Sequence, residues 1–408
     1  AKVAVISSAL CGMVSGSSVG NTVTTGSVTI PMMKETGYKP EFAGAVEAAA
    51  STGGQIMPPI MGAAAFLMAD FIGVPYSDIL MRAIIPAILY FAGIFIAVHL
   101  EAKRLKLSGI PKEQLPKFSK LVKKIYLLLP LVMLVVWVSG NYMTMQKAAS
   151  LSIILAIVVS LFNKESRITL GKCIDALEAG GKGTITVAAA CGVAGIISGS
   201  ITMTGLANEL INGIVTIANN HLIIALVLTM LCCIVLGMGV PTTANYCIMA
   251  ATCAPILIRM GVPALAAHFF VFYFGIVADI TPPVALAAYA GSAIAKSNPM
   301  KTALNASKLA IAVFIVPYVF CYSPGLLLIE TTPLQVLTIA LSAFVGIFGV
   351  SAALEGYLMG NMNIVIRIVF LAAGLLLIIP GTLTDVVGLA MIAAGFLFQK
   401  AVVAPKAA

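Results

Sequence analysis

Long runs of apolar residues, separated by short polar segments, dominate the chain. Residues 79–100, 185–201 and 302–321 are each long enough to cross the roughly 30 Å hydrocarbon core of a bilayer as a helix. Inside a bilayer every backbone polar group has to be satisfied within the protein, and an α-helix achieves this within its own segment. The pattern therefore predicts an all-α polytopic membrane protein with the lipid bilayer as its solvent.

Small and polar residues interrupt the apolar runs at corresponding places in two halves of the chain. In each half an apolar stretch reaches a break, resumes, turns at a glycine and enters a helix that is interrupted before two prolines. This order predicts an internal repeat. A shift of 224 residues superimposes its landmarks: Asn21 on Asn245, Pro31 on Pro255, Gly37 on Gly261, and Pro58-Pro59 on Pro282-Pro283.

The two breaks, residues 15–18 and 237–243, are too apolar in their flanks for aqueous loops and too rich in Gly, Ser, Thr and Pro for continuous helix. Irregular backbone at membrane depth needs protein or a water-filled cavity to satisfy it, so each break predicts a re-entrant helical hairpin. We expect Ser18, and Thr242 or Thr243, to cap the returning half-helices. Capping is the alternative role of the serine and threonine side chains at the breaks, and bridging between helices is that of the two asparagines. The candidate substrate ligands are Ser17, Ser18, Asn21, Thr242, Thr243 and Asn245.

Each interrupted helix, over residues 50–59 and 277–283, carries two prolines that free carbonyl groups from the helical ladder. Asp279 is an acid deep in an apolar span, which is costly and by default functional. Its alternative role is a carboxylate paired structurally with a neighbouring hydroxyl. Carbonyls, hydroxyls and one carboxylate are hard oxygen donors that suit a sodium ion (Na+). The candidate metal ligands are Ser51, Thr52, Gly53, Gly54, Gly237, Gly239, Asp279 and Thr281.

Charge indicates topology. The chain is 60% hydrophobic and 10% charged, and its net charge of +9 resides in short loops between apolar spans, so no nucleic-acid partner is expected. Residues 101–124 hold eight Lys/Arg against two acids and, with residues 164–182, predict cytoplasmic loops joined by spans over 125–138 and 148–162. Counting spans from these loops, the first hairpin enters from the cytoplasm and the second from outside. Such inverted, interrupted repeats point to a transporter's binding site near the bilayer midplane.

We divide the chain into four parts. Residues 1–100 form the first inverted repeat, 101–182 the cytoplasmic basic loops and linking spans, 183–323 the second inverted repeat, and 324–408 a C-terminal membrane extension. The extension lies outside the repeat, so we assign it no transport chemistry. Because the chain begins without Met, inside an apolar segment, we expect a further part upstream.

The sequence motifs around both breaks resemble those of the large membrane subunit of tripartite ATP-independent periplasmic (TRAP) transporters. The resemblance rests on residues 15–66, which contain SGSSVGNT and STGGQIMPP, and on GMGVPTTANYCIMA from Gly237. Residues 266–291, with FGIVADITPP, resemble the branch served by TAXI-type binding proteins, in which the small and large membrane subunits are fused. The resemblance covers nearly all of residues 1–323, and the segment after Pro324 resembles the extension of that branch.

The resemblance implies an elevator transporter in which hairpins and broken helices move against scaffold and arm helices. Residues 205–220 are similar to an arm helix and 185–201 to a scaffold span, and the first repeat's counterparts are expected upstream. The resemblance also implies sodium coupling, a periplasmic TAXI-type substrate-binding protein, and a small membrane subunit or fused N-terminal equivalent. The expected location is a bacterial or archaeal cytoplasmic (inner) membrane, and the expected substrate is a C4-dicarboxylate or another small organic anion.

Four other functions compete with this one. A sodium/dicarboxylate symporter of similar hairpin design works without a binding protein, and a receptor without transport is also open. A channel needs a continuous polar pathway, and no ring of polar positions is evident. An intramembrane enzyme needs a nucleophile with a base or a metal cluster, but His99, His221 and His268 have no ligand spacing. No enzyme is therefore expected. The eight cysteines lie mostly in apolar segments without zinc or disulfide spacing and are interpreted as buried thiols.

Overall fold

The computed structural model describes residues 1–107, 122, 124–140, 142–162, 167–219, 221–378 and 381–403. These residues form helices joined by turns, with one isolated bridge between Tyr357 and Asn361. Four of the described helical segments are long and apolar enough to cross a membrane, and a fifth qualifies if one bent helix pair counts as a single span. The prediction of an all-α fold is therefore confirmed.

The first repeat contains a hairpin, a broken helix and a long span. The hairpin breaks at Gly16, whose φ of 63° is left-handed, and Ser17 caps the returning helix by accepting a hydrogen bond from Gly20 N. The prediction that Ser18 is the cap was wrong by one position, because Ser17 has the extended backbone of an N-cap and Ser18 is already helical. The helices are α1 (Lys2–Ser15), α2 (Ser18–Glu35), α3 (Pro40–Gly54), α4 (Ala63–Ile72) and α5 (Tyr76–Arg104).

The second repeat has the same order of elements. Its hairpin breaks after Gly237, and Pro241 occupies the N-cap position of the returning helix. The prediction that Thr242 or Thr243 caps this helix was wrong, because both lie inside it and proline supplies no side-chain acceptor. The helices are α11 (Leu222–Gly237), α12 (Thr242–Thr252), α13 (Ala254–Arg259), α14 (Ala264–Val277), α15 (Leu286–Ala295), α16 (Pro299–Leu309) and α17 (Ile311–Tyr322).

Backbone conformation follows the 224-residue repeat closely. Gly37 and Gly261, at corresponding positions, have φ angles of 98° and 88°. Met61 and Ala285 also correspond, and both are non-glycine residues with positive φ, 56° and 37°. The Pro-Pro peptide bond is cis in both copies. In each copy the first half of the broken helix, α3 or α14, packs against both helices of its own hairpin.

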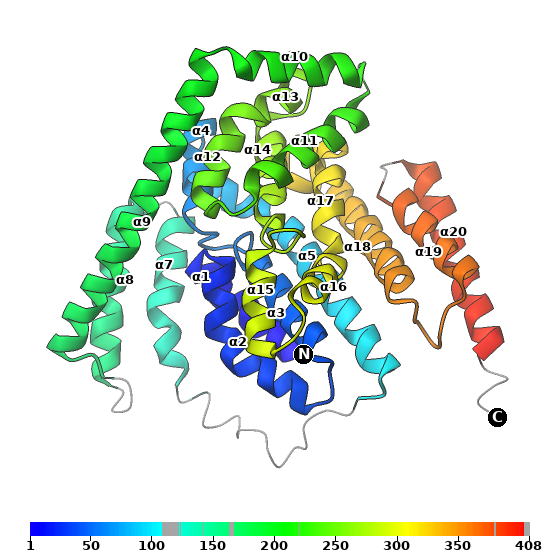
Figure 1. The fold of residues 1–408 in the computed structure, drawn as a ribbon, viewed down its shortest axis with the longest axis horizontal. Helices are drawn as coiled ribbons and strands as arrows, with labels where there is room; N and C mark the ends of the chain where they lie inside the picture. The colour runs from blue at the N-terminus through cyan, green and yellow to red at the C-terminus, as the bar shows by residue number, and fades with distance from the viewer. Residues whose placement is uncertain are drawn as a thin grey trace.

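One helical hairpin and one bent pair of helices lie between α5 and α11. After the short helix η2 (Ile125–Leu128), α7 (Leu129–Ser139) and α8 (Met145–Leu161) pack against each other. The long helix α9 (Leu170–Met203) then runs along one edge of the molecule and α10 (Leu206–Ala218) crosses its end, bent by 69° (Figure 1). Residues 170–182 were expected to form a basic loop, but they belong to α9. This part of α9 is exposed, so its charged side chains are compatible with a helix. Most of the first basic loop, residues 108–121, lies outside the described residues.

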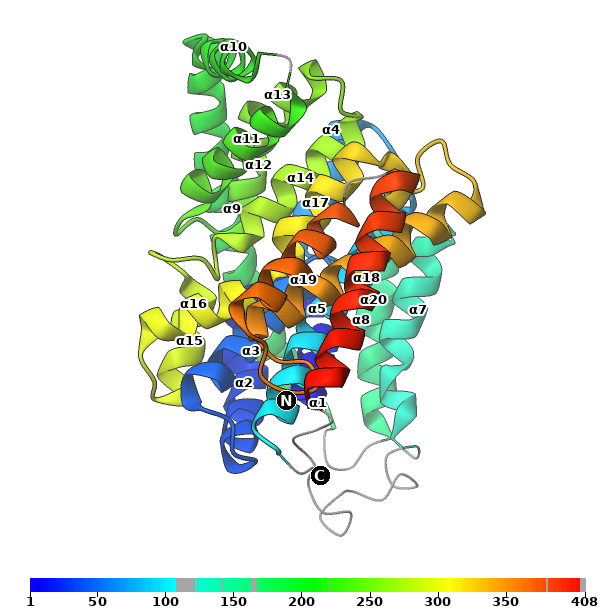
Figure 2. The same cartoon turned by 90° about the vertical axis from the view of Figure 1, so that its right-hand side faces the viewer.

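The C-terminal extension stands on one side of the molecule. After η3 (Pro324–Leu327) it comprises α18 (Pro333–Glu355), α19 (Ile364–Leu376) and α20 (Thr382–Val403), which lie beside one another (Figure 2). The helix α18 packs against α5 and α17, and α19 and α20 are attached through α18. Gly346 and Gly374 allow α18 and α19 a close approach, since a Cβ on Gly346 would lie 2.9 Å from the Gly374 carbonyl oxygen.

Candidate functional site

The centre of the molecule is formed by α3 and α14. Every residue of α3 from 42 to 54, and every residue of α14 from 266 to 277, is buried. Burial on all sides of a helix makes any polar side chain on it costly unless that side chain has a partner. The polar residues of these two helices and of the breaks that follow them are therefore the natural place to look for a binding site.

In the first repeat, Asn21 joins both hairpin helices to α3. Its side-chain amide lies within donating distance of three oxygens: Ser8 O at 3.0 Å, Ser8 Oγ at 2.8 Å and Ser51 Oγ at 3.0 Å. The two serine hydroxyls are themselves 2.9 Å apart. Asn21 and Ser51, both sequence-predicted site residues, are thus brought together, and Asn21 acts as a bridge between helices.

In the second repeat, Asn245 makes the corresponding contact. Its amide donates to Gly275 O over 3.0 Å, and Gly275 occupies the repeat position of Ser51. Gly237 lies against the same amide, because a Cβ on Gly237 would be only 2.7 Å from Asn245 Nδ2. The carbonyl oxygen Oδ1 of Asn245 is buried and has no hydrogen-bond partner among the described residues. A buried acceptor without a donor is what a bound cation or water would satisfy.

Asp279 connects the two repeats. It follows α14 at the break of the second broken helix, and its Oδ2 accepts a hydrogen bond from Ser18 Oγ, in the first hairpin, over 2.5 Å. Only 8% of Asp279 is exposed. The structural alternative, a carboxylate paired with a hydroxyl, is thus present in the geometry. That hydrogen bond involves only Oδ2, so it leaves the negative charge of the carboxylate in place to attract a cation.

Gln55, which the search for site residues missed, occupies the repeat position of Asp279. Its side chain is buried beside the Asp279 carboxylate, although neither its amide nitrogen nor its amide oxygen meets the geometry of a hydrogen bond with a described residue. Thr52, one helical turn earlier, also has a buried hydroxyl without a hydrogen-bond partner among the described residues. The 224-residue offset was the signal that identifies Gln55, since it places this residue on Asp279.

The remaining predicted ligands have more local surroundings. Gly54 packs against Gly12, where a Cβ would lie 2.5 Å from the Gly12 Cα, and Gly53 packs against Tyr90. The Thr281 hydroxyl donates to Val277 O over 2.9 Å, which occupies its only proton. The other four line the hairpin breaks: Ser17 is exposed, Thr242 and Thr243 are partly exposed, and Gly239 has a φ of 75°.

Glu47, on α3, is a second buried acid and is fully enclosed. Thr25 and Thr29, on α2, donate hydroxyl hydrogen bonds to its two carboxylate oxygens, and Ser51 Oγ lies 3.4 Å away. The same threonine hydroxyls also lie within donating distance of carbonyls four residues earlier in α2. Among the described residues no group of three or more His, Cys, Asp or Glu side chains is arranged to hold a metal ion, so a transition-metal centre has no support in this part of the chain.

Comparison with known proteins gives a consistent result. Residues 1–335 match the sequence profile of the family described as tripartite ATP-independent periplasmic transporter, DctM component. A putative TRAP transporter large permease protein of Haemophilus influenzae is 27% identical over 291 residues, which cover 69% of this chain and 66% of that protein. The C4-dicarboxylate TRAP transporter large permease protein DctM of Pseudomonas aeruginosa is 22% identical, with 71% and 67% covered. An uncharacterized Salmonella typhimurium protein, YgiK, is 23% identical, with 80% and 75% covered.

Proposed function

Since the chain belongs to the DctM-component family of TRAP transporters, which are secondary transporter permeases and not enzymes, we propose that it couples sodium influx to the uptake of a small organic acid. The bond between Ser18 and Asp279 carries this proposal, because it joins a hairpin of one repeat to the broken helix of the other. Gln55 lies beside Asp279, and its buried side-chain oxygen, like the buried hydroxyl of Thr52 one helical turn earlier, has no hydrogen-bond partner among the described residues. A sodium ion supplies the positive charge and the coordination that these oxygens lack.

The substrate side of the proposal rests on the second hairpin. The N-terminus of α12 has no side-chain cap, so its first amides stay available, and helix N-termini attract anionic groups. We assign the substrate carboxylate to this end, with Thr242 and Thr243 partly exposed beside it. The P. aeruginosa relative is named for C4-dicarboxylates, which agrees with a carboxylate substrate.

The partners and the mechanism complete the proposal. A periplasmic binding protein of the TAXI type delivers the acid, and a small membrane subunit or a fused N-terminal equivalent supplies the remaining scaffold. The hairpins and broken helices move together as an elevator in the cytoplasmic membrane. Because Ser18 and Asp279 link the two repeats directly, a cation bound there stabilises one arrangement of both hairpins, which is the requirement for coupling ion binding to movement.

Uptake by the full-length permease in proteoliposomes tests the proposal. Initial rates are measured for a labelled dicarboxylate with an inward sodium gradient, with a potassium gradient of equal size, and with or without a purified periplasmic binding protein from the same organism. We expect uptake only with sodium and binding protein together. Uptake with sodium alone favours the binding-protein-independent symporter, and equal uptake in potassium contradicts sodium coupling.

A further inference from the structure

A cavity of about 370 Å³ lies where α3, α5, α16 and α18 meet. It is separate from the site around Asp279, and charged side chains dominate its lining. Four of the lining residues are basic: Lys39, Arg104, Lys301 and Lys308. Three are acidic: Glu41, Glu101 and Glu355. The lining thus carries an excess of one positive charge.

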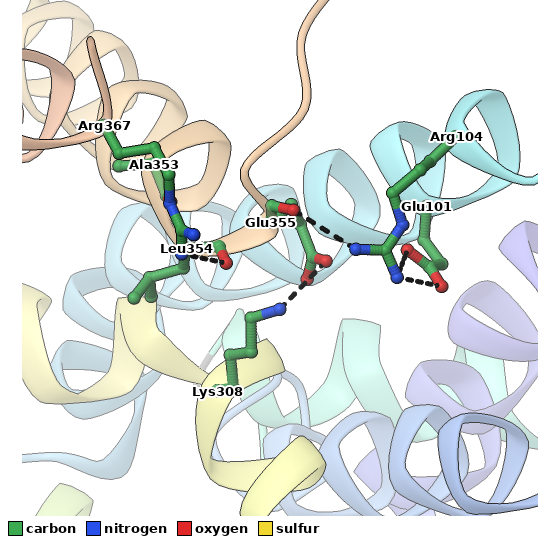
Figure 3. A network of polar contacts seen from close by, with 7 residues as sticks. All are labelled: Glu101, Arg104, Lys308, Ala353, Leu354, Glu355 and Arg367. Carbon is green, nitrogen blue, oxygen red and sulfur yellow. Dashed lines mark hydrogen bonds and ion pairs between the residues drawn. The ribbon is translucent and has the colours of Figure 1, made fainter. Parts of the chain in front are cut away.

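Two of the acids are already neutralised deep in the cavity. Arg104 Nη2 lies 2.7 Å from Glu101 Oε2, and Lys308 Nζ lies 3.0 Å from Glu355 Oε2 (Figure 3). The side chains of both acids are almost completely buried, at 3% and 2% exposure. Arg104 also donates to the Glu355 carbonyl oxygen over 3.4 Å, so the pairs fasten the end of α18 to α5 and α16.

The rim of the cavity has a different character. Lys39 and Lys301 are exposed, and neither forms an ion pair within the described residues. Leu304, one turn after Lys301 on α16, is 57% exposed and also lines the cavity. The rim therefore presents two free ammonium groups, one carboxylate, Glu41, and an apolar side chain to whatever occupies it.

Three membrane-spanning segments end at this cavity. The span Tyr76–Arg104 ends at Arg104, Pro299–Tyr322 begins two residues before Lys301, and Pro333–Glu355 ends at Glu355. The ends of spans lie at the level of lipid headgroups, and the basic loop that follows Arg104 assigns this end to the cytoplasmic leaflet. Basic pockets between helices on this side are suited to phospholipid headgroups.

We propose that the cavity binds the phosphodiester of a phospholipid from the cytoplasmic leaflet, held by Lys39 and Lys301. A phosphodiester carries a single negative charge, which matches the excess of one positive charge in the lining. The exposed side chain of Leu304 lies at the rim, where an acyl chain leaves the headgroup. Because the extension contributes Glu355 to the same cavity, the bound lipid stabilises the docking of α18 on α5 and α16.

Native mass spectrometry of the full-length, delipidated permease, titrated with dioleoylphosphatidylglycerol, tests the proposal. The double variant Lys39→Gln/Lys301→Gln is expected to bind the lipid about 25-fold more weakly, since each lysine near an anionic headgroup contributes about a fivefold factor. Lys296→Gln, an exposed lysine of the same region outside the cavity, is the matched control and is expected to keep wild-type affinity. The melting temperature without lipid should be unchanged, because both substituted lysines are exposed and unpaired within the described residues.

Two competing ligands decide what the cavity recognises. Dioleoylglycerol has the same acyl chains without phosphate, and we expect it to bind wild type no better than the double variant. Glycerophosphoglycerol has the headgroup without acyl chains, and we expect it to compete only at much higher concentration than the lipid. The proposal is overturned if the double variant binds the lipid as tightly as wild type, or if dioleoylglycerol binds equally well. Equal affinity for the soluble headgroup assigns the cavity to a cytosolic phosphate ester and overturns the lipid assignment.

Discussion

Replacing Asp279 with Asn separates the charge of this side chain from its shape. In the wild-type protein Ser18 Oγ donates to Asp279 Oδ2 over 2.5 Å at a position that is 8% exposed. Asparagine keeps one oxygen that accepts the same hydrogen bond, so the link between the first hairpin and the second broken helix survives. We therefore expect the variant to fold and insert normally but to bind sodium weakly.

The size of the effect follows from the lost charge. A sodium ion about 4 Å from a carboxylate gains about 4 kcal/mol at an effective dielectric constant of about 20. The amide oxygen of asparagine recovers part of this, because a dipole also attracts the cation. We expect a net loss of roughly 2–3 kcal/mol in sodium binding, which is an increase of about 30- to 150-fold in the sodium Kd.

The assay is the initial rate of uptake as a function of sodium concentration in proteoliposomes, with binding protein in excess. Asp385→Asn is the matched control, because Ser342 Oγ donates to Asp385 Oδ1 over the same 2.5 Å but in the C-terminal extension. Its sodium curve should equal that of wild type. An unchanged curve for Asp279→Asn would refute the reasoning, and Asp279 would then be a structural acceptor for Ser18.

Three further predictions follow from the packing. Asn21→Ala should lower the melting temperature more than Asn245→Ala in a thermal-unfolding assay, because the first change removes an amide that serves three buried oxygens of Ser8 and Ser51 whereas the second removes a donor to one carbonyl; an equal or reversed order would contradict this. Glu47→Gln should keep the wild-type sodium curve for uptake, because its threonine partners can turn their hydroxyls to backbone carbonyls, and a shifted curve would instead make Glu47 part of the cation site. Cysteines replacing Lys308 and Glu355, joined by a short bifunctional thiol reagent, should leave uptake intact, because the wild-type ion pair already holds α16 and the end of α18 together; loss of uptake only after cross-linking would show that α16 and α18 move apart during transport.

The breaks and turns of the fold were predictable because they are encoded locally. Glycine at 16 and 239 supplies the positive φ that each hairpin needs, and paired prolines interrupt each broken helix. Apolar runs of bilayer length identify the spans without any knowledge of their partners. The repeat adds a second constraint, since a feature recognised in one copy fixes its position in the other.

Contacts between segments far apart in the chain could not be predicted from the pattern of apolar and polar residues. Ser18 and Asp279 are 261 positions apart, and both were selected as candidates without any indication that they bond to each other. The caps were misplaced because Ser17 and Ser18 have equal capping ability, and only the backbone angles decide between them. The length of α9 was missed because charged residues such as Lys172 and Lys182 indicate a loop by composition but also suit an exposed helix.

The difference between Gln55 and Asp279 shows how two equivalent positions take different roles. The 224-residue repeat gives both the same place in a broken helix, but one side chain is a neutral amide and the other a carboxylate. In the proposed sodium site, the second repeat would therefore neutralise the charge of the ion, and the first repeat would supply only a neutral oxygen ligand. The two repeats are nevertheless coupled, because Ser18 of the first hairpin donates a hydrogen bond to the Asp279 carboxylate of the second repeat. If sodium binds at Asp279 as we propose, the ion would contact the second broken helix and, through Ser18, the first hairpin, so its binding or release would act on both repeats at once.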